Sequence, residues 1–253
     1  MKRQIYLTII SIITGLVILF SMLGRSGILP IGIGSSPAKQ SDLIYLDPNG
    51  FHSIDMDLSV AELTVLQNPN HDCYIQYEAS SQKVVPQIGV QNDTLQITQE
   101  NLNQNKLGAN TLTLTLAIPA ECSLQDLALD LGIGDLEFRQ LTAEQFTLHA
   151  GTGDLKITDS SFARAEIEAG IGDVTFQNSP ITNLTLKAGI GDVELYQLTD
   201  LSKYDLDITV GVGDLTVEGE SKSGLGRAYK QTGDGTYSYK IENGTGDVTL
   251  SSN

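Results

Sequence analysis

Six aspartates, each directly after a G-x-G triplet, are the side chains of this sequence best suited to do chemistry. They are spaced by 19, 19, 19, 22 and 33 residues, and they are Asp135, Asp154, Asp173, Asp192, Asp214 and Asp247. Repeated carboxylates could hold Ca²⁺, but that ion takes about 6–8 oxygens, and no second ligand recurs at a fixed offset. They could also serve a carbohydrate-active hydrolase on a β-helix, which needs two carboxylates in different environments. Because the six are equivalent, we expect them to fix turns, with no catalytic, cofactor-binding or metal-binding residue among them.

The histidines of the chain do not indicate a catalytic site. None of them lies in a G-x-S-x-G, H-E-x-x-H or C-x-x-C motif, and they are His52, His71 and His149. His149 falls at an outward position of its expected strand. The G-x-G segments precede expected strands rather than helices, so they are not phosphate-binding loops. We therefore expect that the protein is not an enzyme and uses no cofactor.

Cys73 and Cys122 are the two cysteines of the chain. In an exported domain they could form a disulfide, because oxidising compartments allow one. Cys73 also alternates with Ile75 and Tyr77, which is how a small buried residue of a strand would lie. The sequence leaves open whether the two cysteines pair.

The six aspartates belong to a segment that recurs along the chain, and such repetition predicts stacked structural units. Its copies are LALDLGIGDLEF (127–138), FTLHAGTGDLKI (146–157), AEIEAGIGDVTF (165–176), LTLKAGIGDVEL (184–195), LDITVGVGDLTV (206–217) and YKIENGTGDVTL (239–250).

Each copy alternates apolar and polar residues, the pattern of a half-buried strand. In the fourth copy, Lys187 should point outward, and the residues expected to point inward are Leu184, Leu186, Ala188 and Ile190, then Val193 and Leu195. The apolar set resumes one residue out of phase after Gly191 and Asp192, which indicates a bulge or corner. Gly suits a corner because it reaches positive φ, and Asp because its carboxylate accepts backbone N–H groups.

A seventh, degenerate copy precedes the array. Its alternation runs from Ile54 to Val65, with Glu62 in place of the aspartate, and we expect it to be a terminal rung. Between it and the array lies an insertion, about 66–125, with expected strands at 73–80, 83–90, 94–98 and 111–119 and a loop from Gln99 to Asn110. The stretch before the last copy is expected to be a loop or hairpin, and its Gly233-Asp234-Gly235 is a turn signal.

These elements predict an all-β fold without a helix after residue 24. A repeat of this kind cannot bury its apolar face alone, so its copies must stack. We predict a β-solenoid, similar to a single-stranded parallel β-helix, in which the array occupies about 126–253. A β-sandwich is the alternative, because alternating strands about every ten residues would also suit it.

The N-terminal segment predicts a membrane anchor. Residues 5–23 carry no charge and are dominated by Ile, Leu, Val and Phe, and as a helix they would span about 28 Å, close to the thickness of a bilayer core. Lys2 and Arg3 precede them, so residues 1–4 should be cytoplasmic and residues 43–253 outside. A cleaved signal peptide is the competing reading. The Gly-, Ser- and Pro-rich residues 24–42 should form a linker.

The net charge of the chain limits the kinds of molecule that the protein can bind. The chain carries a formal net charge of −16, and all 31 acidic residues but only 12 of the 15 basic ones follow residue 30, so that part carries 12 − 31 = −19. Such a surface does not attract nucleic acid or anionic lipid headgroups. It could attract cations or basic polymers, although solubility alone would explain it.

An N-terminal apolar segment, a first strand pair (MDLSVAELTV), a middle strand (LTLAIP) and repeated GxGDL/V units resemble a bacterial family of putative adhesins with β-strand repeats, common in Gram-positive cell envelopes. The resemblance covers about residues 43–253. It implies a solenoid-like fold and a surface role, and leaves the activity undefined. Together with the anchor it predicts a single-pass protein of the cell membrane whose extracellular domain binds or scaffolds an unidentified envelope polymer or protein. This sequence departs from the family's simplest pattern at Glu62 and in the long gap before Asp247.

Overall fold

The computed structural model describes residues 39–99, 110–196 and 198–252. The expected cytoplasmic residues, the expected anchor and most of the expected linker therefore lie outside the described residues, as does most of the loop expected from Gln99 to Asn110. Within the described part of the chain, no helix is both long and apolar enough to cross a membrane. The last three residues of the linker expected to run to residue 42 belong instead to a strand, which begins at Gln40.

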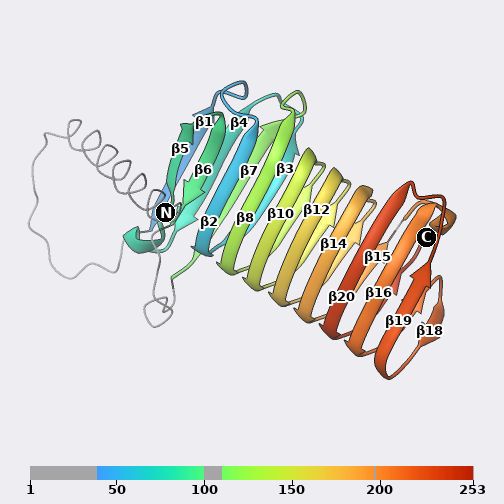
Figure 1. Ribbon diagram of the computed structural model, residues 1–253. Helices are drawn as coiled ribbons and strands as arrows, with labels where there is room; N and C mark the ends of the chain where they lie inside the picture. Colours follow the sequence, from blue (N-terminus) through green and yellow to red (C-terminus); the bar gives the residue numbers. More distant parts are fainter. Residues whose placement is uncertain (1–38, 100–109, 197, 253) are drawn as a thin grey trace, which may run out of the picture. The chain divides into compact units, whose positions relative to one another are not determined.

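The predicted all-β fold is confirmed for these residues. They form two sheets, one of 11 strands and one of 10, and most neighbouring strands in the array are parallel (Figure 1). Side chains from both sheets contribute to one hydrophobic core. The regular elements outside the sheets are two short 3₁₀ turns, η1 (Gln82–Val84) and η2 (Leu201–Lys203).

Each copy of the repeat forms one long strand in the 10-stranded sheet and one short strand in the 11-stranded sheet. The long strands are β8 (Leu124–Ile133), β10 (Thr142–Thr152), β12 (Ser161–Ile171), β14 (Ile181–Ile190), β16 (Tyr204–Val212) and β20 (Tyr237–Thr245). The short strands are β9 (Leu136–Arg139), β11 (Leu155–Thr158), β13 (Val174–Gln177), β15 (Val193–Tyr196), β17 (Leu215–Val217) and β21 (Val248–Leu250). Long strands pair with long strands and short with short, in register, so that Leu148 lies between Leu129 and Ile167.

The stacking order departs from the sequence order at the C-terminal end. The last copy, β20 with β21, lies between the fourth copy and the fifth, because β20 pairs with both β14 and β16 (Figure 1). The long gap before the last copy holds β18 (Glu220–Lys222) and β19 (Leu225–Gln231), which pair antiparallel with β17 and β16. The chain thus covers the outer edge of the fifth copy before it returns to fill the space inside.

The degenerate copy forms β2 (Ser53–Val60) and β3 (Glu62–Asn68), which pair with β8 and β9. The expectation that it is the terminal rung is wrong, because strands of the insertion pair on its other side. The strands of the insertion are β6 (Thr94–Thr98) with β5 (Gln87–Gln91) in one sheet, and β7 (Leu112–Pro119) and β4 (Cys73–Ala79) in the other. In that second sheet β1 (Gln40–Leu46), which precedes the degenerate copy in the sequence, pairs with β4. The insertion extends both sheets rather than forming a separate unit.

The strand expected at 83–90 is interrupted. Its first residues belong to η1, and β5 begins only at Gln87. Pro86 lacks an N–H group and restricts Val85 to extended backbone, so a strand cannot run through this point as an interior ladder. Val85 accordingly has φ −64° and ψ 124°.

The expected inward orientation of Ile190 is also wrong. Leu184 and Leu186 are fully buried and Ala188 nearly so, but Ile190 is 54% exposed. The equivalent residues Ile133, Ile171 and Val212 are exposed to a similar degree. The corner therefore begins at Gly189, two residues before the Gly-Asp pair at which the pattern predicted it, and burial resumes at Val193.

Candidate binding surface

The corner between the two strands of a copy is built by two glycines. A Cβ on Gly189 would stand 2.4 Å from the carbonyl oxygen of Gly170, and one on Gly191, which has φ +141°, would stand 2.0 Å from that of Gly172. In each of the two glycines, the hydrogen in the side-chain position therefore points along the stack toward the preceding copy, and no side chain would fit there. Ile190 lies between them and projects outward, which explains its exposure.

The motif aspartates form a continuous hydrogen-bonded column along these corners. In stacking order, each carboxylate Oδ1 accepts the backbone N–H of the next aspartate, at N···O distances of 2.8–2.9 Å. The order is Asp135, Asp154, Asp173, Asp192, Asp247 and Asp214. The prediction that corner N–H groups would satisfy the aspartates is confirmed, and the donor lies in the neighbouring copy rather than in the same corner.

Two substitutions of Asp173 distinguish a column of aspartates that only fixes the corners from a column that binds metal ions. Carboxylates one strand apart, about 4.8 Å, repel by about 1 kcal/mol in water and about 3 kcal/mol at an effective dielectric constant of 20. Asp173→Asn keeps an Oδ1 acceptor for the Asp192 N–H and relieves the repulsion, so its melting temperature should change little. Asp173→Ala loses the acceptor and should destabilise the protein by about 1.5–3 kcal/mol.

Thermal melting with and without a chelator is the measurement for this pair. A chelator should leave both melting temperatures unchanged, because the carboxylates already accept protein hydrogen bonds. Equal damage from Asn and Ala, together with a large effect of the chelator on the unsubstituted protein, would instead show that the column holds a cation.

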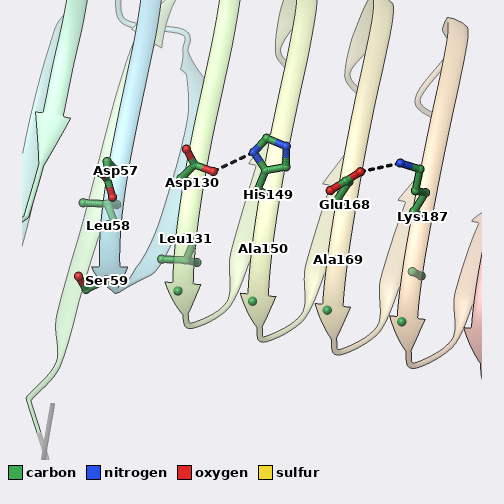
Figure 2. Close-up of a pocket in the computed structure, with 15 residues that line it drawn as sticks. Asp57, Leu58, Ser59, Asp130, Leu131, His149, Ala150, Glu168, Ala169 and Lys187 are labelled. Carbon is green, nitrogen blue, oxygen red and sulfur yellow. Dashed lines mark hydrogen bonds and ion pairs between the residues drawn. The ribbon is translucent and has the colours of Figure 1, made fainter. Parts of the chain in front are cut away.

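A shallow groove of about 710 Å³ runs across the outer surface of five strands of the 10-stranded sheet, next to the corners (Figure 2), and these strands are β2, β8, β10, β12 and β14. Each strand contributes three consecutive residues: a polar side chain, a small or apolar residue, and the residue at the first corner position. Four glycines occupy that last position, namely Gly132, Gly151, Gly170 and Gly189. The absence of side chains there makes the groove, and the exposed Ile171 and Ile190 follow directly after two of these glycines. We call this surface the glycine groove.

The polar side chains of the glycine groove form one row, with one member per strand: Asp57, Asp130, His149, Glu168 and Lys187. His149 Nδ1 lies 2.8 Å from Asp130 Oδ1, and Lys187 donates to Glu168 Oε1 at 2.7 Å (Figure 2). The outward position expected of His149 is confirmed by its exposed side chain. The hydrogen bond from Lys187 holds the pKa of Glu168 below its ordinary value.

At the other end of the row, Asp57 lies directly opposite Asp130 across the β2–β8 pair, and like charges in that position destabilise a sheet. Partial burial raises the pKa of Asp57, and the charges of Asp130 and Asp55 add to that shift. The pKa of Asp55 is raised as well, first by burial and then by Asp130. Sequence patterns do not reveal this crowding, because Asp130, the partner of Asp57, lies 73 residues further along the chain.

The raised pKa of Asp57 sets a pH dependence of stability. A group whose pKa is higher in the folded state than in the unfolded one favours folding when protonated, and this contribution is lost as the pH rises through the folded pKa. Asp57→Asn should therefore be more stable than the unsubstituted protein at pH 7, by about 0.5 kcal/mol for so exposed a residue. The difference in stability between the two proteins should disappear at about pH 3, below the pKa of about 3.9 that an aspartate has in an unfolded chain.

Glu168→Gln is the matched control, because the pKa of Glu168 is lowered. Its substitution should destabilise at pH 7, and that loss should vanish on acidification. Urea unfolding of both variants at the two pH values measures these changes in the free energy of unfolding. A destabilising effect of Asp57→Asn at neutral pH would contradict the assigned repulsion.

The remaining histidines and the cysteines lie apart from the groove. His52 pairs with Asp93, and His71 with Glu121, at Nδ1–oxygen distances of 2.9 and 2.8 Å. Both cysteines are free thiols, and burial, with a smaller contribution from Cys122, raises the pKa of Cys73 to about 12. Cys73 is a buried residue of β4, as its alternation predicted. Among the described residues, no group of three or more His, Cys, Asp or Glu side chains could hold a metal ion.

Comparison with known proteins identifies one family and several solved structures. A family model described as Toastrack DUF4097 matches residues 51–253. A putative cell adhesion protein from Clostridium sporogenes has 14% identity and a TM-score of 0.49, over 85% of this chain and 99% of that one. A putative adhesin from Bacteroides fragilis has 16% identity and a TM-score of 0.44, over 85% and 99%. A putative lipid binding protein from Parabacteroides distasonis has 10% identity and a TM-score of 0.32, over 84% and 94%. No curated protein matches the chain.

Proposed function

The chain belongs to the Toastrack DUF4097 family, and on that premise we propose that it is a binding or scaffolding module of the cell envelope that performs no catalysis. In this proposal residues 5–23 anchor the chain in the cell membrane, and the β-domain faces the outside and contacts an envelope polymer or protein. The stacked copies then act as a β-solenoid, a rigid and elongated support for a binding surface.

The observation that supports this function is the repetition of the glycine groove. Its five strands present the same three positions in register, so the surface is a row of repeated positions, with polar side chains of different chemistry, rather than a single centre. Catalysis by carboxylates needs an acid and a base in different environments. The motif aspartates accept equivalent hydrogen bonds along their column, which supports binding over hydrolysis.

Site-specific photo-crosslinking on intact cells tests the binding role. A photoreactive residue at position 149, in the groove, should capture an envelope component, and one at position 144 should not. Glu144 lies on the same strand, exposed but outside the groove. Equal capture at both positions, or none at position 149, would overturn the proposed surface. Release of reducing ends from cell-wall polysaccharide by the purified domain would replace binding with hydrolysis.

The topology is tested separately. Protease added to intact protoplasts should digest the β-domain, because Lys2 and Arg3 place the N-terminus inside. Protection of the domain would overturn the outward orientation. A mature N-terminus that begins after residue 24 would replace the anchor with a cleaved signal peptide.

A further inference from the structure

The fold brings the segments of the two cysteines together, although 49 residues separate them (122 − 73 = 49). Cys73 is the first residue of β4 and is 2% exposed, and Cys122 lies just beyond the end of β7, packed against the same hydrophobic core. β4 and β7 pair antiparallel, with Tyr74 opposite Ala117. The start of β4 therefore lies beside the end of β7, and each of these strand ends adjoins a cysteine.

A hydrogen-bonded pair joins the residues next to the cysteines. His71 Nδ1 lies 2.8 Å from Oε1 of Glu121. His71 stands two residues before Cys73, and Glu121 directly precedes Cys122. This contact is between side chains outside the strands, so it places the two segments against each other independently of the register of the sheet.

The first strand of the β-domain is next to both cysteines. Leu46, the last residue of β1, lies opposite Cys73. The thiol of Cys122 donates a hydrogen bond to the carbonyl oxygen of Pro48 at 3.4 Å, and Pro48 is only two residues after Leu46. Because β4 lies between β1 and β7, Cys122 reaches past the start of β4, where Cys73 lies.

The two thiols are poor nucleophiles and are close enough to affect each other. Burial raises the pKa of both, and the next contribution to the raised pKa of Cys73 is a negative charge on Cys122. A cysteine that attacks a substrate has a lowered pKa instead, and neither of these does. Oxidation to a shared disulfide is therefore the chemistry that their positions favour.

We propose that Cys73 and Cys122 form an intramolecular disulfide when the exported protein is oxidised, and that this bond fastens the insertion to the end of the stack. The bond would close a segment that contains all four strands of the insertion, β4, β5, β6 and β7. It would stabilise the fold by restricting the unfolded chain. This inference goes beyond the binding role and does not depend on the glycine groove.

The oxidant is another disulfide, such as that of an envelope oxidase or of oxidised glutathione. The thiolate of Cys122, the more exposed of the two cysteines, attacks one sulfur of this reagent and releases one thiol, which leaves a mixed disulfide. The thiolate of Cys73 then attacks the sulfur of Cys122 and releases the second thiol. The two cysteines are thereby oxidised, and the reagent takes up two electrons and two protons as it is reduced to two thiols.

A redox equilibrium with glutathione tests the geometry. The full-length chain, either reduced or oxidised at the start, is held in mixtures of oxidised and reduced glutathione until both samples reach the same ratio of disulfide to dithiol. The equilibrium constant should be at least about thirtyfold higher for the folded protein than in concentrated urea, because a disulfide that suits the fold stabilises it by that factor or more. An equal or lower constant for the folded protein, or a disulfide between two molecules, would overturn the inference.

Melting temperatures give a second measurement. Oxidation should raise the melting temperature of the unsubstituted protein by about 5 °C or more. Cys122→Ser keeps a donor for Pro48, so it should melt like the reduced protein, and it should not respond to the oxidant. Cys73→Ala should lose the response as well, and it supplies the same test if the serine variant does not fold. A response in either variant would assign the stabilisation to another cause and overturn the pair.

Trapping in cells tests whether the bond forms where the protein acts. Cells are quenched with acid, and the denatured chain is treated with maleimide before and after reduction. No maleimide should attach before reduction, and two should attach afterwards. Two attached before reduction, in a chain whose β-domain protease digests on protoplasts, would overturn the inference. Free thiols together with protection from protease would overturn the proposed outward orientation instead, and the glutathione equilibrium would then decide the inference.

Discussion

Gly191→Ala should destabilise the protein by more than about 4 kcal/mol, a loss confined to a few severe mechanisms. Its new Cβ would stand 2.0 Å from a backbone oxygen of the neighbouring copy, at a φ of +141°. Neither the oxygen nor the Cβ is at the end of a flexible side chain, so relief requires the two copies to separate. Separation breaks strand pairing on both sheets, and much of the protein's total stability is then lost.

Two other glycines are the controls for this prediction. Gly89→Ala adds a methyl group where no atom lies within 4 Å, so its unfolding midpoint in urea should be unchanged or slightly raised. Gly219→Ala combines a φ of +80° with open space, so it should show backbone strain alone, about 1–2 kcal/mol. A loss below about 2 kcal/mol for Gly191→Ala would mean that the copies move apart easily, which would contradict a tightly stacked corner.

Removal of residues 236–253 should unfold more than the copy that it deletes. Because β20 and β21 lie inside the two sheets, the truncation leaves β16 and β17 without their parallel partners. It also removes four buried apolar side chains, each contributing about 1.5–3 kcal/mol, and these are Tyr239, Ile241, Val248 and Leu250. Amide hydrogen exchange should show loss of protection throughout β16 to β19, while β8 and β10 keep theirs.

The control is a chain shortened by Ser252 and Asn253 alone, which should exchange like the complete protein. If the copies stacked in sequence order, removal of the last one would only expose the edge of the fifth, and β16 would stay protected. Protection of β16 equal to that of β10 in the longer truncation would show that β16 pairs directly with β14 once β20 is gone.

Local features of this chain were predictable from sequence because they depend on neighbours in sequence. Strict alternation identified the long strands, and the recurring Gly-Asp pair identified the corners and the acceptor role of the aspartates. The exposure of Ile190 was not predictable in this way. It follows from Gly189 turning toward the carbonyl of Gly170 in the copy before it, a contact along the stack that alternation does not record.

The stacking order of the copies and the glycine groove could not be predicted from the sequence, for a related reason. Nothing within the last copy distinguishes it from the others, so its place between β14 and β16 depends on the path of the segment before it, in which β18 pairs with β17 and β19 with β16. The row of the glycine groove likewise combines Asp57 with Asp130, His149 and Glu168, which belong to separate copies. Their outward positions could be assigned one by one, but their common register required the pairing of the strands.

The strands at the ends of the two sheets bear on solubility. A stack of identical parallel units is a template onto which a further unit, from the same chain or from another molecule, could add, and exposed strand edges promote aggregation. Here the outermost strands at both ends run antiparallel to their neighbours. β18 has only three residues, and β19 carries Arg227 and Lys230. A further copy in the orientation of the others would have to pair antiparallel with the outermost strand, so the parallel array does not simply continue at either end.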